Sequence, residues 1–270
     1  MSMRTTLKIL LLIGIFINTS CEDLFDYSPY AIDFSDENRD INQRNIERLL
    51  NCKNDDTITI AFTGDTHRFF DETELFVSAV NKNPAIDFVI HVGDIADFGL
   101  PKQYLWGNSY LLKLNVPYFV VIGNHDLVGN GSQAYQEMFG DLNYSFIYTS
   151  IKFVYINTNS REFKFNGNVP DIKWLDNQLQ PSIDFTKAVV IFHVPPTDSD
   201  FDASLKEAFQ NSLAHYNNVL LTVHGHLHHH EIYKPFADSI PFVNVFGVEH
   251  LKYNSIKISN NQFEVETIEF

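Results

Sequence analysis

Five short turns carrying Asp, Asn or His follow five apolar runs of the chain, and this pattern constrains the fold more than any other feature. Each run is rich in β-branched and aromatic residues, which is typical of a buried strand. Polar stretches of helical character lie between the runs, so the sequence predicts an α/β fold. The polar residues of the turns are Asp65 and His67, Asp94 and Asp97, Asn124 and His125, His193, and His226 and His228.

The same patterns predict the individual elements. The strands before the five turns are expected over 57–62, 87–92, 118–122, 188–193 and 219–224. Helices are expected over 71–81, 101–114 and 170–179, with a short one near Leu205 and a hairpin formed by 144–148 and 152–157. Strands over 230–233, 242–246, 255–258 and 263–268 are expected to form a second sheet packed against the first.

The turns are expected to share one pocket, because ligands of open α/β sheets bind outside the carboxyl ends of the strands. Seven oxygen and nitrogen donors gathered there would repel one another unless cations separate them, and a single metal ion cannot use them all. Two ions at a spacing of about 3.5–4 Å can clamp the attacking and leaving oxygens of a phosphoryl group. The sequence therefore predicts a dinuclear centre with one shared carboxylate.

Taken in order, the turns resemble the signature of the calcineurin-like metallophosphoesterases. The resemblance covers residues 57–270 and implies a four-layer α/β/β/α sandwich of two packed mixed β-sheets flanked by helices. The matching segments are Asp65-Thr66-His67, Gly93-Asp94-Ile95-Ala96-Asp97, Gly123-Asn124-His125-Asp126, His193, and Gly225-His226-Leu227-His228.

The resemblance also implies a role for each residue. One ion would be held by Asp65, His67, Asp94 and His228. The other would be held by Asp94, Asn124, His193 and His226, with Asp94 bridging the two. The two divalent ions could be manganese, iron or zinc, and a hydroxide between them would be the nucleophile. His125 would stabilise the phosphoryl oxygens or protonate the leaving oxygen, and Asp97 would orient and charge His125.

Several positions leave alternatives open. Asp97 stands where purple acid phosphatases have a Tyr ligand, and Phe98 where protein Ser/Thr phosphatases have an Arg, so neither subclass is favoured. Arg68 could contact a substrate phosphate or be an exposed loop residue, and Asp126 could support its turn or be solvated. Strand alternation favours a non-ligand role for the remaining histidines of the last turn, His224, His229 and His230.

The N-terminal residues predict export. Arg4 and Lys8 flank the apolar run 9–17, which is too short to span a bilayer and fits a signal peptide over residues 1–20. Cys21 follows small polar residues, as in a bacterial lipobox, so we expect a lipid on Cys21 that anchors the protein to a membrane of the cell envelope. The alternative is a soluble secreted or periplasmic protein. Residues 21–56 are expected to be an acidic tether with a possible helix over 40–50, followed by the phosphoesterase domain over 57–270.

Composition limits the partners. The net charge is −15, which disfavours a protein that coats nucleic acids and favours a small phosphate ester as substrate. The two cysteines, Cys21 and Cys52, cannot form a cysteine-based zinc site, and Cys52 is expected to be buried. The resulting prediction is a metal-dependent phosphodiesterase or phosphomonoesterase acting outside the cytoplasm. The alternative is a catalytically silent surface lipoprotein that binds a phosphorylated or glycan ligand.

Overall fold

The structure, a computed structural model, describes residues 28–52, 57–236 and 240–270. The predicted signal peptide and Cys21 lie outside the described residues. All elements below belong to one compact unit that runs from Ile32 to Phe270. None of the helices in the described part of the chain combines the length and the apolar composition that crossing a bilayer requires.

Two mixed β-sheets form the centre of this unit. The first has the strand order β11-β10-β1-β2-β3, in which β1, β2 and β3 run parallel. Its strands are β1 (Thr57–Thr63), β2 (Phe88–His91), β3 (Tyr118–Val120), β10 (Lys252–Ser259) and β11 (Gln262–Glu269). The second has the order β4-β5-β6-β7-β9-β8. Its strands are β4 (Tyr144–Tyr148), β5 (Ile151–Tyr155), β6 (Lys187–Ile191), β7 (Val219–His224), β8 (Glu231–Tyr233) and β9 (Phe242–Asn244).

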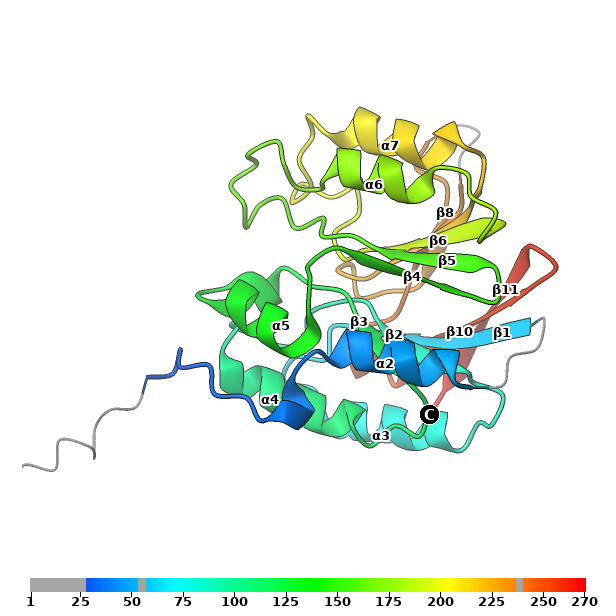
Figure 1. Cartoon of the computed structure of the whole chain (residues 1–270). Coiled ribbons are helices and arrows are strands. Elements are labelled where there is room, and N and C mark those ends of the chain that lie inside the picture. Colours follow the sequence, from blue (N-terminus) through cyan, green and yellow to red (C-terminus); the bar gives the residue numbers. More distant parts are fainter. Residues whose placement is uncertain (1–27, 53–56, 237–239) are drawn as a thin grey trace, which may run out of the picture. The chain divides into compact units, whose positions relative to one another are not determined.

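Helices cover the outer faces of the two sheets (Figure 1). On the side of the first sheet lie α2 (Ile41–Leu50), α3 (Phe70–Asn81), α4 (Pro101–Leu111) and α5 (Gly131–Phe139). On the side of the second lie α6 (Ile172–Leu179) and α7 (Lys206–His215). Three short 3₁₀ helices are η2 (Asp36–Asn38), η3 (His125–Leu127) and η4 (Val248–His250). The predicted sandwich of two packed sheets flanked by helices is confirmed.

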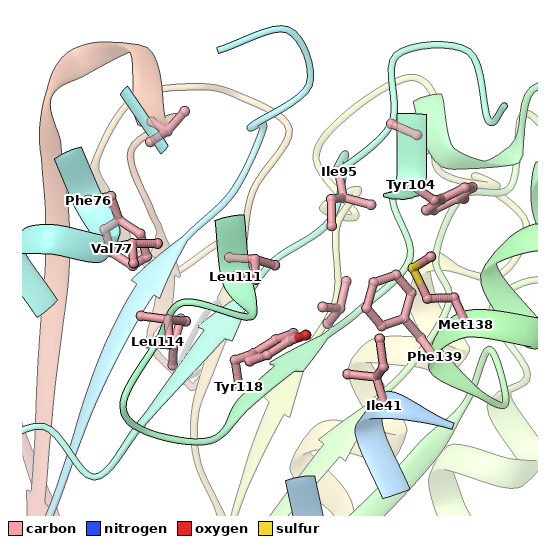
Figure 2. Packing of buried hydrophobic residues seen from close by; sticks show 14 of the residues in the cluster. Ile41, Phe76, Val77, Ile95, Tyr104, Leu111, Leu114, Tyr118, Met138 and Phe139 are labelled. Atoms are coloured by element: carbon pink, nitrogen blue, oxygen red, sulfur yellow. The ribbon is translucent and has the colours of Figure 1, made fainter. Parts of the chain in front are cut away.

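Three hydrophobic clusters hold the layers together, and the strands contribute alternate residues to them. Ile58, Ile60 and Phe62 of β1 belong to the cluster between the sheets, whereas Ala61 belongs to the cluster under the helices. Side chains therefore alternate between the two faces of the sheet, and the face away from the other sheet carries the half-buried Thr57 and Thr59 as well as Ala61. Figure 2 shows part of the helix-side cluster, where Leu111, Met138 and other residues of α3, α4 and α5 pack together.

The predicted membership of the second sheet is wrong. The hairpin β4–β5 begins that sheet, and β8 and β9 join it, but β10 and β11 return to the first sheet. β10 pairs antiparallel with β1, so Ile256 and Ile258 lie opposite Ile60 and Ile58 and share the core between the sheets. A period of two identifies a strand but does not choose its neighbour. Helix α5 was not predicted at all.

The compact unit begins at Ile32, earlier than the predicted boundary at residue 57, because α2 packs against it. Ile41 and Leu49 of α2 are buried, whereas Leu50 is exposed. The Asn42 side-chain amide donates to the Val120 carbonyl (3.1 Å) and accepts from the Val120 N–H (3.0 Å), so it pairs with the edge strand β3 as a neighbouring strand would. Cys52, expected to be buried, is exposed just beyond the end of α2.

Candidate metal centre

The five polar turns meet at one place, although their strands belong to two sheets. In the first sheet, Asp65 and His67 follow β1, Asp94 and Asp97 follow β2, and Asn124 and His125 follow β3. In the second sheet, His193 follows β6, and His226 and His228 follow β7. The convergence arises because the packed sheets both have parallel central strands that end at this edge, as ligand sites of α/β folds require.

The turns need unusual backbone conformations to aim these side chains. Asp65, Asp94, His226 and His228 all have positive φ angles, between 53° and 73°. Such conformations cost about 1–3 kcal/mol each for residues other than glycine and persist where the surrounding structure holds them, commonly at functional sites.

One group of ligand atoms comes from Asp65, His67 and His228, which lie within 4.8 Å of one another. Nε2 of His228 is 3.3 Å from Oδ1 of Asp65. Asp65 and His67 are buried, whereas the side chain of His228 is 39% exposed and forms the open side of the group. The structure thus brings together three of the four residues expected to hold the first ion, and Asp94 joins them through the second group.

The second group is centred on His193. Its Nε2 lies 3.2 Å from Oδ2 of Asp94, 3.1 Å from Oδ1 of Asn124 and 3.9 Å from Oδ1 of Asp65. Nδ1 of His226 lies 3.1 Å from the same Asn124 oxygen. His193 therefore links the two groups, and all seven predicted ligands form one continuous set.

The donor set fits divalent cations. Asp65 is fully buried, and neither of its oxygens has a hydrogen-bond partner, nor does either ring nitrogen of His67. Buried polar groups without partners are costly, and a cation between carboxylate oxygens and imidazole nitrogens would satisfy them. Mixed nitrogen and oxygen donors suit manganese, iron and zinc alike.

The pKa values of the ion-free site also indicate a place for a cation. Burial raises the pKa of Asp65 to about 6. Burial alone would lower the pKa of His193, but the charge of Asp94 and the hydrogen bond to it raise that pKa to about 10. Burial would likewise raise the pKa of Asp94, yet His193 lowers it below its usual value. In the ion-free site, a proton on His193 thus balances the negative charge of the buried carboxylates, and a bound cation could take over this role.

Asp126 supports the turns that carry Asp94 and Asn124. Its buried carboxylate accepts from the backbone N–H groups of Asp94 (2.9 Å), Ala96 (2.8 Å) and Gly123 (2.8 Å). Burial and the nearby Asp94 raise the pKa of Asp126 to about 7. Of the two predictions for this residue, the structure agrees with the supporting role and not with a solvated one.

His125 lies at the rim, with 38% of its side chain exposed, and its ring stacks on His67 at a centroid distance of 4.6 Å. Nδ1 is 3.0 Å from the backbone oxygen of Asp97 and 3.5 Å from its carboxylate. The carboxylate of Asp97 accepts a hydrogen bond from Arg68, whose side chain is 57% exposed. Arg68 is therefore tied to Asp97 at the rim of the site, and the other N–H groups of its exposed guanidinium are not engaged by this bond.

The other histidines of the last turn lie outside the close ligand groups found among the described residues. His224 is buried, stacks on Phe192, and hydrogen-bonds the Tyr233 hydroxyl through Nε2 (2.9 Å). Burial lowers the pKa of His224 to about 3, so the ring is neutral. His230 faces the Asn244 carbonyl, and His229 is exposed.

Sequence reasoning missed the carboxylates behind the ligands. Oε1 of Glu249 lies 2.6 Å from Nδ1 of His228, and Oδ1 of Asp198 lies 3.5 Å from Nε2 of His226. Asp200 is 3.9 Å from the same His226 nitrogen and pairs with Arg161. These residues were not among the polar residues singled out in the five turns.

The comparison with known families decides the class of this protein. The family model described as calcineurin-like phosphoesterase matches residues 58–230, which include all seven predicted ligands. The chain belongs to this family. The predicted resemblance is thus confirmed, and the match ends before β9, β10 and β11.

Two curated relatives of this phosphoesterase are named as phosphodiesterases. The chain is 27% identical over 161 residues to a probable glycerophosphodiester phosphodiesterase of Arcobacter nitrofigilis, covering 55% of this chain and 59% of that protein. It is 23% identical over 174 residues to a 3',5'-cyclic-nucleotide phosphodiesterase of a Nostoc species, covering 58% and 62%. The matches thus span less than two thirds of either relative.

Solved structures share the fold of this phosphoesterase. A dimetal phosphatase from Danio rerio superposes with a TM-score of 0.62 at 15% identity, covering 80% of this chain and 98% of that chain. At this identity the likeness concerns the fold alone.

Proposed function

We propose that this protein is a dinuclear metal-dependent hydrolase of phosphodiesters. The observation that carries the proposal is the set of buried, unpartnered donors of Asp65 and His67 beside the group around His193. Two adjacent ligand groups joined through His193, Asp65 and Asp94 suit two cations better than one. Residues Asp65, His67, Asp94 and His228 would hold one ion, and Asp94, Asn124, His193 and His226 the other.

Two divalent cations, when bound, supply Lewis acidity toward a phosphoryl oxygen and lower the pKa of water toward neutrality. The chain's own residues set the conditions for this chemistry. Asp65 and Asp94 offset the charge of the ions, whereas Asn124 adds a donor oxygen without adding negative charge. Burial of these carboxylates excludes bulk water and strengthens their electrostatic interactions.

His125 supports the departure of the leaving group. Its Nδ1–H donates to the backbone carbonyl of Asp97, because a carbonyl oxygen can only accept, and this leaves Nε2 available at the exposed rim. In its protonated form, Nε2 can donate to a phosphoryl oxygen or give its proton to the leaving oxygen. Asp97 and the stacked His67 ring hold the imidazole in place.

Charge around the site supports a diester over a monoester. Two basic side chains beside the site form ion pairs with carboxylates: Arg68 with Asp97, and Arg161 with Asp200 and Glu162. Asp198 and Glu249 add further carboxylates behind His226 and His228. A monoester dianion would meet more repulsion here than a diester monoanion, and both curated relatives carry phosphodiesterase names.

A turnover panel tests the proposal. Protein reconstituted with manganese, zinc or iron is assayed with a bis-aryl phosphate, an aryl monophosphate and a cyclic nucleotide. We expect the highest kcat/KM with a diester. A preference for the monoester would contradict the diester assignment, and no turnover with any metal would contradict an enzymatic function and favour a silent ligand-binding protein.

We also propose that the protein acts outside the cytoplasm, anchored through a lipid on Cys21. The support is the sequence alone, in which Arg4, Lys8 and the apolar run 9–17 precede the cysteine. The test is partitioning into detergent of the wild type and of Cys21→Ser, with Cys52→Ser as the control. Equal partitioning of wild type and Cys21→Ser would contradict the anchor.

A further inference from the structure

Glu249 is a carboxylate outside the family match that faces a predicted ligand. It lies in η4, beyond residue 230, where the match ends. Its Oε1 is 2.6 Å from Nδ1 of His228, and the opposite ring nitrogen, Nε2, is 3.3 Å from Oδ1 of Asp65. The imidazole of His228 therefore stands between two carboxylates.

The two ring nitrogens of His228 have different hydrogen-bonding roles. An ionised carboxylate only accepts, so the short contact to Glu249 places the hydrogen on Nδ1 of His228. In the neutral ring Nε2 then carries a lone pair that faces the Asp65 oxygen, which is also an acceptor. Two acceptors that face each other suit a cation between them.

Backbone contacts of η4 hold Glu249 within hydrogen-bond distance of His228. The N–H of Val248 donates to the carbonyl of Gly64 (3.1 Å), which ties η4 to the turn that carries Asp65. A Cβ on Gly247 would overlap the Glu249 carboxylate, so a side chain at position 247 would displace that carboxylate from its place beside His228. Oε2 of Glu249 is buried and has no hydrogen-bond partner, and the whole side chain is 22% exposed.

The other histidines of the centre are held differently. Nδ1 of His193 donates to the Val92 carbonyl (2.7 Å), which is neutral. Nε2 of His226 is 3.5 Å from Asp198, beyond a strong hydrogen bond. His193 hydrogen-bonds the Asp94 carboxylate, but through Nε2, the nitrogen on its ligand side, whereas His228 has a carboxylate on the nitrogen opposite Asp65. His228 is also the most exposed of the three rings, so it gains most from an external support.

We propose that Glu249 is a positioning residue that fixes the orientation and the Nδ1–H tautomer of His228, and thereby completes the ion site of Asp65, His67 and His228. The proposal rests on the proposed function insofar as that site holds a metal ion. Loss of such a partner typically lowers metal affinity by about 10–100-fold. The effect should fall on one of the two ions, because His226 and His193 do not contact Glu249.

The test compares Glu249→Ala and Glu249→Gln with Glu231→Gln. Glu231 is a matched control, since its carboxylate lies 3.6 Å from Nε2 of His229, an exposed histidine outside the ligand groups. Calorimetric titration with Mn²⁺ should show one binding step weakened about 10–100-fold in Glu249→Ala, a smaller loss in Glu249→Gln, and none in Glu231→Gln. Nitrogen-15 spectra of His228 in ion-free protein, recorded at a pH high enough for the ring to be neutral, should show the Nδ1–H tautomer in the wild type and a mixture in Glu249→Ala, which has no acceptor at this position.

Unchanged affinities in Glu249→Ala, an equal loss at both steps, or an unchanged tautomer in Glu249→Ala would each overturn the proposal. Circular dichroism of the ion-free variants monitors folding, and Glu249→Gln carries the test if Glu249→Ala does not fold. The proposed function fails separately, if the wild type binds no Mn²⁺ and shows no turnover. A wild type that binds two ions and hydrolyses a diester while Glu249→Ala binds both equally well would contradict only the role of Glu249.

Discussion

Gly123 lies directly against Asp94, so that a Cβ at position 123 would overlap both the backbone nitrogen and Oδ1 of Asp94. The backbone of Asp94 cannot yield easily, because Asp126 holds it. We expect Gly123→Ala to displace the Asp94 carboxylate, abolish binding of at least one ion, and destabilise the fold by about 1–3 kcal/mol. Metal content and chemical denaturation measure both effects. Gly167→Ala, where no atom lies within 4 Å but φ is +75°, is a control for backbone strain away from Asp94 and should keep its metal.

His125 and Asn124 are neighbours with different expected roles. His125→Ala should keep both ions and lower kcat by about 10²–10⁴-fold, because it removes a proton donor and no ligand. Asn124→Ala should lose metal and activity together, since the Asn124 oxygen contacts both His193 and His226. Metal analysis and steady-state kinetics separate the two results, with exposed His229→Ala as the control. Loss of metal from His125→Ala would refute its assigned role.

Ion binding should be coupled to proton release. His193, with a pKa raised to about 10, carries a proton at pH 7.5 when no ion is bound, and its Nε2 must lose that proton to become a ligand. Asp65, whose pKa is raised to about 6, carries a second proton when the pH is below that pKa. Metal affinity should therefore rise with pH between 5 and 8, about tenfold per pH unit for each proton released. Calorimetry in buffers of different ionisation enthalpy measures the release, and an affinity independent of pH over this range would contradict it.

The pairing of Asn42 with Val120 gives α2 a structural role in the catalytic fold. Asn42→Ala leaves the buried N–H of Val120 without a partner, whereas the Val120 carbonyl keeps the hydroxyls of Tyr135 and Tyr144. We expect a loss of about 1–3 kcal/mol in the free energy of unfolding, measured in urea. Gln43→Ala, on the exposed face of the same helix, should change it by less than about 0.5 kcal/mol.

The sequence was sufficient to group the candidate ligands because each follows a strand, and a strand has a clear period. The runs before Asp65, Asp94 and Asn124 contain strands β1, β2 and β3, and all seven candidate ligands lie together. The error about β10 and β11 has a different origin. Period-two alternation says that Ile256 and Ile258 face a core, but the choice of β1 as partner depends on tertiary packing.

The sequence could not predict the contacts by which residues outside the five turns support a candidate ligand or the sheet. Glu249 lies 21 positions from His228 and Asn42 lies 78 positions from Val120, so no local pattern connects either pair. The buried side chains of α5, such as Tyr135 and Met138, do recur at helical spacing, but the helix has only nine residues and begins with Gly131 and Ser132, which are poorer helix formers. The exposure of Cys52 likewise follows from where α2 ends and not from the hydrophobicity of a thiol.

The antiparallel pairing of β1 with β10 sets an order of assembly. Until the polypeptide has been synthesised to residue 259, the apolar strand that leads to Asp65 has one unprotected edge, which is prone to pair with other chains. Closure of this long loop is slow compared with local folding. We therefore expect any cation to bind late, after the hairpin of β10 and β11 has docked and η4, which precedes it, has placed Glu249 beside His228.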